Sequence, residues 1–101
     1  MVKLIALYQK PADVEAFNQH YRNVHIPLAN KMPGLRRCEL GWVTGAPGGE
    51  ARYHLVAELY FDDMEALNAA MKSPEGKAAA KDLMSFAGPI VHLMVADAAQ
   101  G

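Results

Sequence analysis

Apolar residues follow two different spacings along the chain and divide it into predicted strands and helices. Residues 2–9, VKLIALYQ, form an apolar run rich in β-forming residues that ends before Pro11, which predicts a first strand. Residues 35–44, 52–61 and 90–96 have the same character and predict three more strands. A glycine-rich loop joins the second and third strands, which therefore form a predicted hairpin with a long connection.

Residues 14–28 repeat their apolar side chains every three or four positions, as the buried face of a helix does. Asp13 precedes them and is a residue type that caps helix N-termini. Pro27 lacks a backbone N–H and disfavours helical geometry at the residue before it. The sequence therefore predicts that this helix ends or kinks near His25.

A second helical segment covers residues 64–72 and restarts at Ser73-Pro74, where a capping residue precedes a proline at the first helical position. The restarted helix runs to residue 86, before a Gly-Pro pair. The resulting order of strand, helix, strand, strand, helix, strand is the ferredoxin-like βαββαβ pattern of α+β proteins. It predicts one domain, residues 1–101, with helices on one face of a four-stranded antiparallel sheet.

The second face of the predicted sheet needs a cover of its own. The first and last strands are apolar on both faces, and the third presents Val56 beside His54 and Glu58 on its second face. We expect His54 to be exposed, and Glu58 to pair with Arg37, Arg52 or His92, because a lone carboxylate inside a sheet is costly. A partner sheet is the expected cover of the apolar surface, which predicts a homodimer packed through the sheet face.

Composition and charge exclude several classes of protein. The 101 residues are 51% hydrophobic and 21% charged, which excludes a disordered tail. A net charge of −1 gives no reason to expect nucleic-acid binding, and no stretch is long and apolar enough for a membrane span or a signal peptide. Cys38 is the single cysteine, so an internal disulfide is impossible and a cytoplasmic location is expected.

One segment carries a family likeness. The signature residues are Phe17, Tyr21, His25, Pro27, Leu28, Ala29, Pro33, Gly34, Leu35 and Arg36. Together they resemble the motif of the EthD family, which is named for an operon that degrades ethyl tert-butyl ether. The later stretches AELYFDDMEAL and SPEGKAAAKDL are similar to the family's third strand and its following helix, so the likeness spans nearly the whole chain.

The resemblance implies a dimeric α+β barrel, in agreement with the topology predicted above. Barrels of that superfamily include cofactor-free monooxygenases, polyketide cyclases and dehydratases, haem-degrading enzymes, muconolactone isomerases and proteins with no assigned reaction. Fold alone does not choose among these activities. For this chain we expect a small enzyme or enzyme-like protein that binds an apolar, cyclic or aromatic metabolite.

His25 is the candidate catalytic residue. A neutral imidazole at the open end of a cleft between the first helix and the sheet could take or give a proton near neutral pH. On the structural reading, His25 instead donates a hydrogen bond to a carbonyl freed by the helix break. Tyr8, Tyr21, Trp42 and His92 are candidate ligand-binding residues, although each is also an ordinary type for a core or interface position.

Neither a metal site nor a cofactor is expected from the motifs. His20 lies five residues before His25 and off its helical face, so the two do not form a helical metal pair. No glycine-rich loop precedes a helix, which argues against a phosphate site.

Three hypotheses about the function remain. One is a cofactor-free cyclase, dehydratase, isomerase or monooxygenase that uses His25. Another is a non-catalytic accessory or carrier protein, and the third is a haem protein with His25 or His92 as axial ligand.

Overall fold

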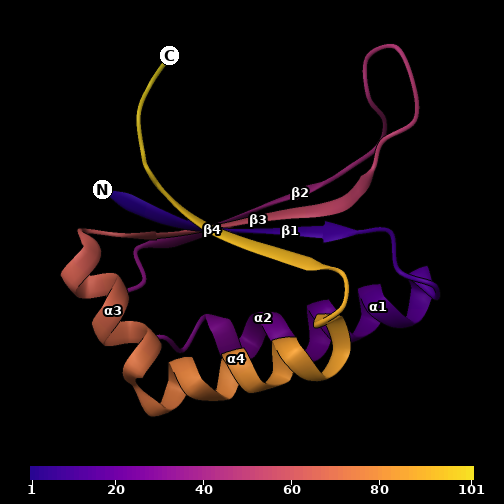
Figure 1. Ribbon diagram of the computed structural model, residues 1–101. Coiled ribbons are helices and arrows are strands. Elements are labelled where there is room, and N and C mark those ends of the chain that lie inside the picture. Colours follow the sequence, from indigo (N-terminus) through magenta and orange to yellow (C-terminus); the bar gives the residue numbers. More distant parts are fainter.

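Helices cover one face of a four-stranded antiparallel sheet in the computed structural model, which describes residues 1–101 (Figure 1). The strand order is β2-β3-β1-β4. This arrangement confirms the predicted ferredoxin-like βαββαβ fold. In chain order the elements are β1 (Val2–Gln9), α1 (Val14–His20), η1 (Tyr21–His25), α2 (Ile26–Ala29), β2 (Arg37–Trp42), β3 (Tyr53–Phe61), α3 (Met64–Lys72), α4 (Pro74–Ala87) and β4 (Val91–Asp97).

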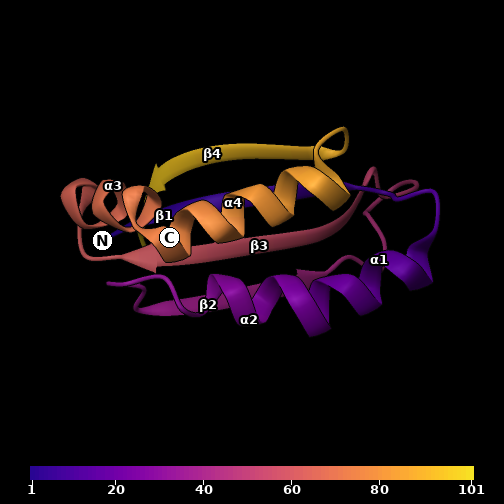
Figure 2. The ribbon, with the colours of Figure 1, turned by 90° about the horizontal axis from the view of Figure 1, so that it is seen from below.

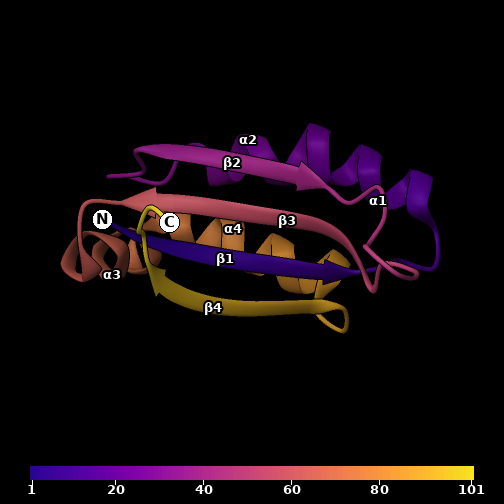
Figure 3. The same ribbon diagram turned by 90° about the horizontal axis from the view of Figure 1, so that it is seen from above.

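The helical layer covers the sheet unevenly. Seen from the helix side, the run α1–η1–α2 lies along the β2 side of the sheet and α4 runs beside it, while β4 extends beyond α4 (Figure 2). Seen from the other side, the sheet carries no helix at all (Figure 3). We call this uncovered side the outer face. None of the helices combines the length and the apolar character that crossing a bilayer requires.

The first helix does not end near His25, which was one of the two predicted outcomes, but its α-helical geometry is interrupted there. Helical structure continues from Val14 to Ala29, and η1 is a π-helical turn in which the N–H of Ile26 donates to the carbonyl of Tyr21. A π-turn adds one residue to the helix and so loosens the turn just before the proline, where an α-helix would suffer from the missing donor and the ring clash. The backbone of Ile26 therefore stays helical, with φ −61° and ψ −43°.

A β-bulge near the start of β3 changes which face His54 occupies. The register shifts so that Gln9 lies opposite Tyr53, which leaves His54 as the extra residue. The imidazole of His54 then meets the helical layer, where Nε2 lies 2.7 Å from Oδ1 of Asn18 and the ring packs against Phe17. The expectation that His54 is exposed on the second face is wrong, because a bulge reverses the alternation on which it relied.

The outer face combines apolar side chains with one central ion pair. Val56 lies opposite Leu7 on this face, as the alternation of β3 predicts. Nζ of Lys3 lies 2.8 Å from Oε1 of Glu58, so the carboxylate pairs with β1 and not with any of the three expected partners. β1 is the strand next to β3 and brings Lys3 within a diagonal step of Glu58. The apolar members of the outer face include Ile5, Leu7, Val56, Met94 and Ala96.

Gly76 allows the start of α4 to pack directly on the end of α3. A Cβ atom at Gly76 would clash with the carbonyl oxygen of Ala70 and lie 2.9 Å from Cα of Met71. We expect Gly76→Ala to lower the free energy of unfolding by about 1–3 kcal/mol, because backbone atoms cannot yield to the added methyl group. Urea unfolding followed by circular dichroism measures this. Gly45→Ala, in open loop space, is the matched control, and equal midpoints for both variants would contradict the close packing.

Candidate functional site

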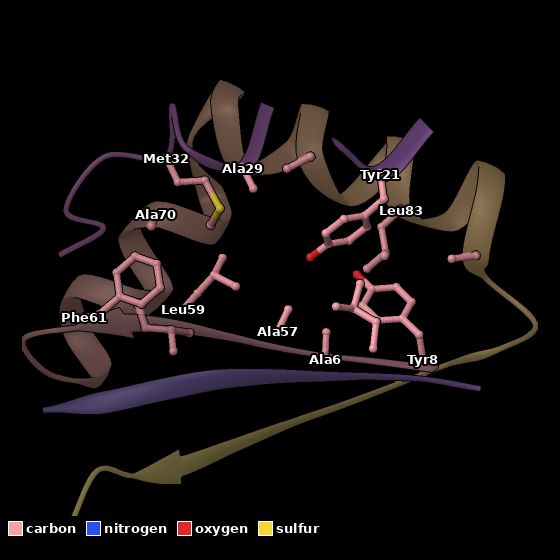
Figure 4. Close-up of a cluster of buried hydrophobic side chains, with 14 of the residues drawn as sticks. Ala6, Tyr8, Tyr21, Ala29, Met32, Ala57, Leu59, Phe61, Ala70 and Leu83 are labelled. Atoms are coloured by element: carbon pink, nitrogen blue, oxygen red, sulfur yellow. The ribbon is translucent and has the colours of Figure 1, made fainter. Parts of the chain in front are cut away.

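A cavity of about 100 Å³ lies between the helices and the sheet. Of its 17 lining residues, only Tyr8, Tyr21 and His25 have polar side chains. Figure 4 shows the hydroxyl groups of Tyr8 and Tyr21 entering the space between the helices and the small side chains of Ala6 and Ala57. An apolar cavity of about 150 Å³ binds benzene, so this smaller cavity suits a ligand of at most one small ring.

His25 lies at one side of this cavity, on the π-turn. His25 is only 7% exposed. Apart from tyrosines, it is the only buried residue with an ionisable side chain. Nδ1 of His25 lies 3.1 Å from Oδ2 of Asp82, which comes from α4. The ring also packs against Phe86, with centroids 5.3 Å apart. Two helices therefore hold the imidazole in place.

Asp82 accepts hydrogen bonds from a second histidine. Nε2 of His20 lies 2.9 Å from Oδ1 and 3.1 Å from Oδ2 of the same carboxylate. An ionised carboxylate is an acceptor only, so His25 donates through Nδ1–H and Nε2 of His25 keeps its lone pair. No fully buried side-chain nitrogen or oxygen in the chain lacks a hydrogen-bond partner. Since no protein group bonds Nε2 of His25, this nitrogen is free and not fully buried, and His25 is among the residues that line the cavity.

The π-turn explains why sequence reasoning separated His20 from His25. In an α-helix, residues five positions apart point in different directions, but the extra residue of η1 turns both rings toward Asp82. The expectation that the two histidines lie on different faces is therefore wrong. Asp82 was missed altogether. Its one signal is its position three residues after Ala79 and four before Phe86, on the apolar face of α4.

Burial sets the protonation state of His25. Loss of solvent lowers the pKa of His25, and the hydrogen bond and negative charge of Asp82 only partly offset this effect. The net shift is downward from the ordinary value, so the imidazole is neutral near pH 7. A neutral, oriented imidazole is the form that can accept a proton.

Burial also shifts the pKa values of the two tyrosines, but upward. Burial raises the pKa of Tyr8 and the pKa of Tyr21 far above the ordinary value of a phenol. Both hydroxyls are therefore protonated over the whole neutral range and act as hydrogen-bond donors. The cavity thus contains a neutral base and two neutral donors.

The remaining candidate residues lie outside the cavity lining. Trp42 packs edge-on against Tyr21, with ring centroids 5.7 Å apart, but does not line the cavity. His92 lies opposite Leu7 on the outer face and contacts Tyr53, on the far side of the sheet from the cavity. The structure therefore brings Tyr8, Tyr21 and His25 of the predicted set together around the cavity, places Trp42 behind Tyr21, and leaves His92 on the opposite face of the sheet.

Neither metal nor haem chemistry finds support in this geometry. No group of three or more His, Cys, Asp and Glu side chains is arranged to hold a metal ion. A haem contains four rings in one plane and is much larger than a cavity of about 100 Å³. His92, the other proposed axial ligand, does not face the cavity.

Comparison with known proteins decides the family. Residues 9–90 match the family model described as the EthD domain. The chain belongs to the EthD family. It is 33% identical, over 97 residues, to a Rhodococcus erythropolis protein described as an uncharacterized 11.0 kDa protein in the thcB-thcC intergenic region, and the match covers 96% of this chain and 94% of that protein.

Solved structures extend the comparison of this EthD protein. An ethyl tert-butyl ether degradation (EthD) family protein from Bacillus halodurans is 48% identical, with a TM-score of 0.96 over 98% of this chain and 99% of that one. A hydroxynitrile lyase from Passiflora edulis is 14% identical, with a TM-score of 0.75 over 99% and 94% of the two chains. A dimeric ferredoxin-like protein of unknown function from Thermobifida fusca is 16% identical, with a TM-score of 0.72 over 96% and 90%. The last two similarities concern the fold.

Asp82→Asn tests the role of the carboxylate. Because Asp82 raises the pKa of His25 against the effect of burial, its neutralisation should lower that pKa further. It should also remove the preference for the Nδ1–H tautomer. Nitrogen-15 NMR of the His25 ring across a pH titration measures both changes. Asp97→Asn, at the exposed end of β4, is the control, and an unchanged His25 titration in Asp82→Asn would contradict the assignment.

Proposed function

We propose that this EthD protein binds a small, apolar, cyclic metabolite between its helices and its sheet and moves a proton on it. His25 is the general acid or base. One observation carries the proposal: a buried imidazole borders an apolar cavity, with its Nδ1 held 3.1 Å from Asp82 and its Nε2 free. An oriented base beside a water-poor cavity is what proton transfer on a weakly acidic carbon or hydroxyl group requires.

His25 and Asp82 act together in a simple cycle of proton transfers. Nε2 of His25 takes a proton from the bound ligand, and the resulting imidazolium is stabilised by the carboxylate of Asp82. His20 donates to the same carboxylate and keeps it in place during the cycle. The imidazolium then returns the proton to another atom of the ligand. Isomerisation consists of two such transfers. Dehydration adds the departure of water and cyclisation adds the closure of a ring bond, and each can begin with the same proton removal, so the chemistry needs no cofactor.

The fold neighbours support the proposal at the level of architecture. The Passiflora edulis protein is named as a hydroxynitrile lyase, so a helix-covered sheet of this shape can support an enzyme. At 14% identity this is an analogy of fold, and the residues of the cavity carry the argument for this chain.

A carrier or accessory role is the alternative, and the apolar lining of the cavity favours it equally. A carrier would use the same space to bind the metabolite and would leave its protons in place. Turnover in the wild-type protein therefore separates the two functions, even before the natural ligand is known.

Proton exchange on small carbon acids tests the enzyme directly. Cyclohexanone and nitrocyclohexane are incubated with the protein in D₂O, and deuterium incorporation is followed by NMR. We expect the wild-type protein to accelerate exchange on at least one of them, and His25→Ala, once circular dichroism shows that the variant is folded, to lose about 10²–10⁴-fold of that rate. His54→Gln, which keeps a hydrogen-bonding group outside the cavity, is the control. Binding without exchange in the wild-type protein would overturn the enzyme in favour of the carrier.

We also propose that the protein is a homodimer whose protomers meet through their outer faces. The Thermobifida fusca protein of the same fold is described as dimeric. The outer face presents Leu7, Val56 and Met94 without any covering element, and a second copy of that face is the simplest cover.

Cys38 is an unpaired thiol, which fits a reducing location such as the cytoplasm.

Val56→Asp tests the dimer. A carboxylate at the centre of a buried sheet-to-sheet interface would be unpaired and would cost several kcal/mol, so the variant should be monomeric or unfolded. Light scattering at micromolar concentration measures the mass. Val14→Asp adds the same charge at the exposed start of α1 and should leave the mass unchanged. A wild-type mass near that of one chain would exclude the dimer.

A further inference from the structure

Two tyrosine hydroxyls form the polar end of the cavity. Tyr8 comes from β1 and Tyr21 from η1, and each is only 1% exposed. Their rings meet edge to face with centroids 5.5 Å apart. Figure 4 shows both hydroxyls entering the space above Ala6 and Ala57. The lining offers no other polar side chain except that of His25.

The hydrogen bonding of this pair leaves at least one donor free. Each phenol carries a single O–H proton, so two neighbouring hydroxyls can satisfy at most one donor between them. At least one O–H proton of the pair is therefore available to a ligand in the cavity that both tyrosines line. A buried donor without an acceptor is costly, so a bound ligand that supplies one gains affinity.

We propose that the ligand carries a carbonyl group whose oxygen accepts a hydrogen bond from the Tyr8–Tyr21 pair. The substrate class is then a small, neutral, cyclic ketone, aldehyde or enone. The chemical step rests on the proposed function of His25, whereas recognition of the carbonyl oxygen does not.

The lack of charged side chains around the cavity argues against a charged group on the ligand. No Lys or Arg lines the cavity, so a ligand carboxylate or phosphate would be buried without a counter-charge. No Asp or Glu lines it either, so an ammonium group is disfavoured for the same reason. A carbonyl oxygen is an acceptor only and matches the hydroxyl donors. It also makes the neighbouring C–H bond acidic enough for an imidazole base.

Removal of a proton beside the carbonyl needs no reagent other than His25. Nε2 of His25 forms a new N–H bond as the C–H bond beside the carbonyl breaks. The C–H electron pair becomes a C=C bond, and the carbonyl π pair moves to oxygen. The tyrosine hydroxyl donates to the resulting enolate oxygen and keeps its own proton, in the manner of an oxyanion hole. Return of the proton to the same carbon gives exchange, and its return to a conjugated position gives an isomer.

Binding of two matched ligands tests the carbonyl site without any turnover. Cyclohexanone and methylenecyclohexane have nearly the same shape, but only cyclohexanone has an acceptor oxygen. Methylenecyclohexane is the more hydrophobic of the two, so the test compares how each affinity responds when a hydroxyl is removed. Tyr8→Phe and Tyr21→Phe should each weaken cyclohexanone binding roughly three- to tenfold, in line with one hydrogen bond lost, and leave methylenecyclohexane binding unchanged. Titration of amide NMR signals measures both dissociation constants.

Tyr53→Phe removes a hydroxyl on the far side of the sheet and should leave both affinities unchanged. A cyclohexanone affinity that survives both Tyr8→Phe and Tyr21→Phe would overturn the inference, as would an equal loss of affinity for the two ligands. A cyclohexanone affinity that depends on the tyrosines, without deuterium exchange in the wild-type protein, would support the carbonyl site and remove the catalytic function. Exchange on nitrocyclohexane, with cyclohexanone binding that does not depend on the tyrosines, would do the reverse.

Discussion

The site depends on one carboxylate that accepts hydrogen bonds from two histidines on another helix. Asp82 joins α4 to the first helix through His20 and His25, and Phe86 packs against both rings. Without that acceptor, Nδ1–H of His25 would be buried without a partner and neither tautomer would be preferred. The same contact therefore holds the two helices together and decides which nitrogen of His25 keeps a free lone pair.

The contact exists only because the first helix contains a π-turn. An extra residue between His20 and His25 brings both rings to the same side, and it also relieves the strain that Pro27 would impose on an α-helix. A proline thus stabilises the irregular turn that the site requires. This connects the motif at Tyr21, His25 and Pro27 to chemistry: its residues are a donor, a base and the residue that favours the turn between them.

Periodicity was enough to predict the fold, since the strands and helices repeat their apolar residues at regular spacings, and the signature pointed to His25 and Tyr21. The rest could not be predicted for specific reasons. The π-turn and the bulge at His54 each insert one residue, which reverses any argument based on regular spacing. Asp82 belongs to the site through a contact with a helix 57 residues away in sequence, and that contact requires three-dimensional packing. His92 looked equivalent to a cavity residue because its strand is apolar on both faces.

Burial gives the cavity its chemical character. The removal of water lowers the pKa of His25 and raises the pKa of Tyr8 and Tyr21, so one cause moves all three groups to their neutral forms. Near pH 7 the cavity therefore presents a base and hydroxyl donors but no formal charge. A charged ligand would lose its hydration and gain no counter-ion, whereas a neutral ring with one acceptor oxygen would lose little hydration and fill a vacant hydrogen bond. The selectivity for neutral, acceptor-bearing ligands thus follows from the same burial that keeps His25 able to take a proton.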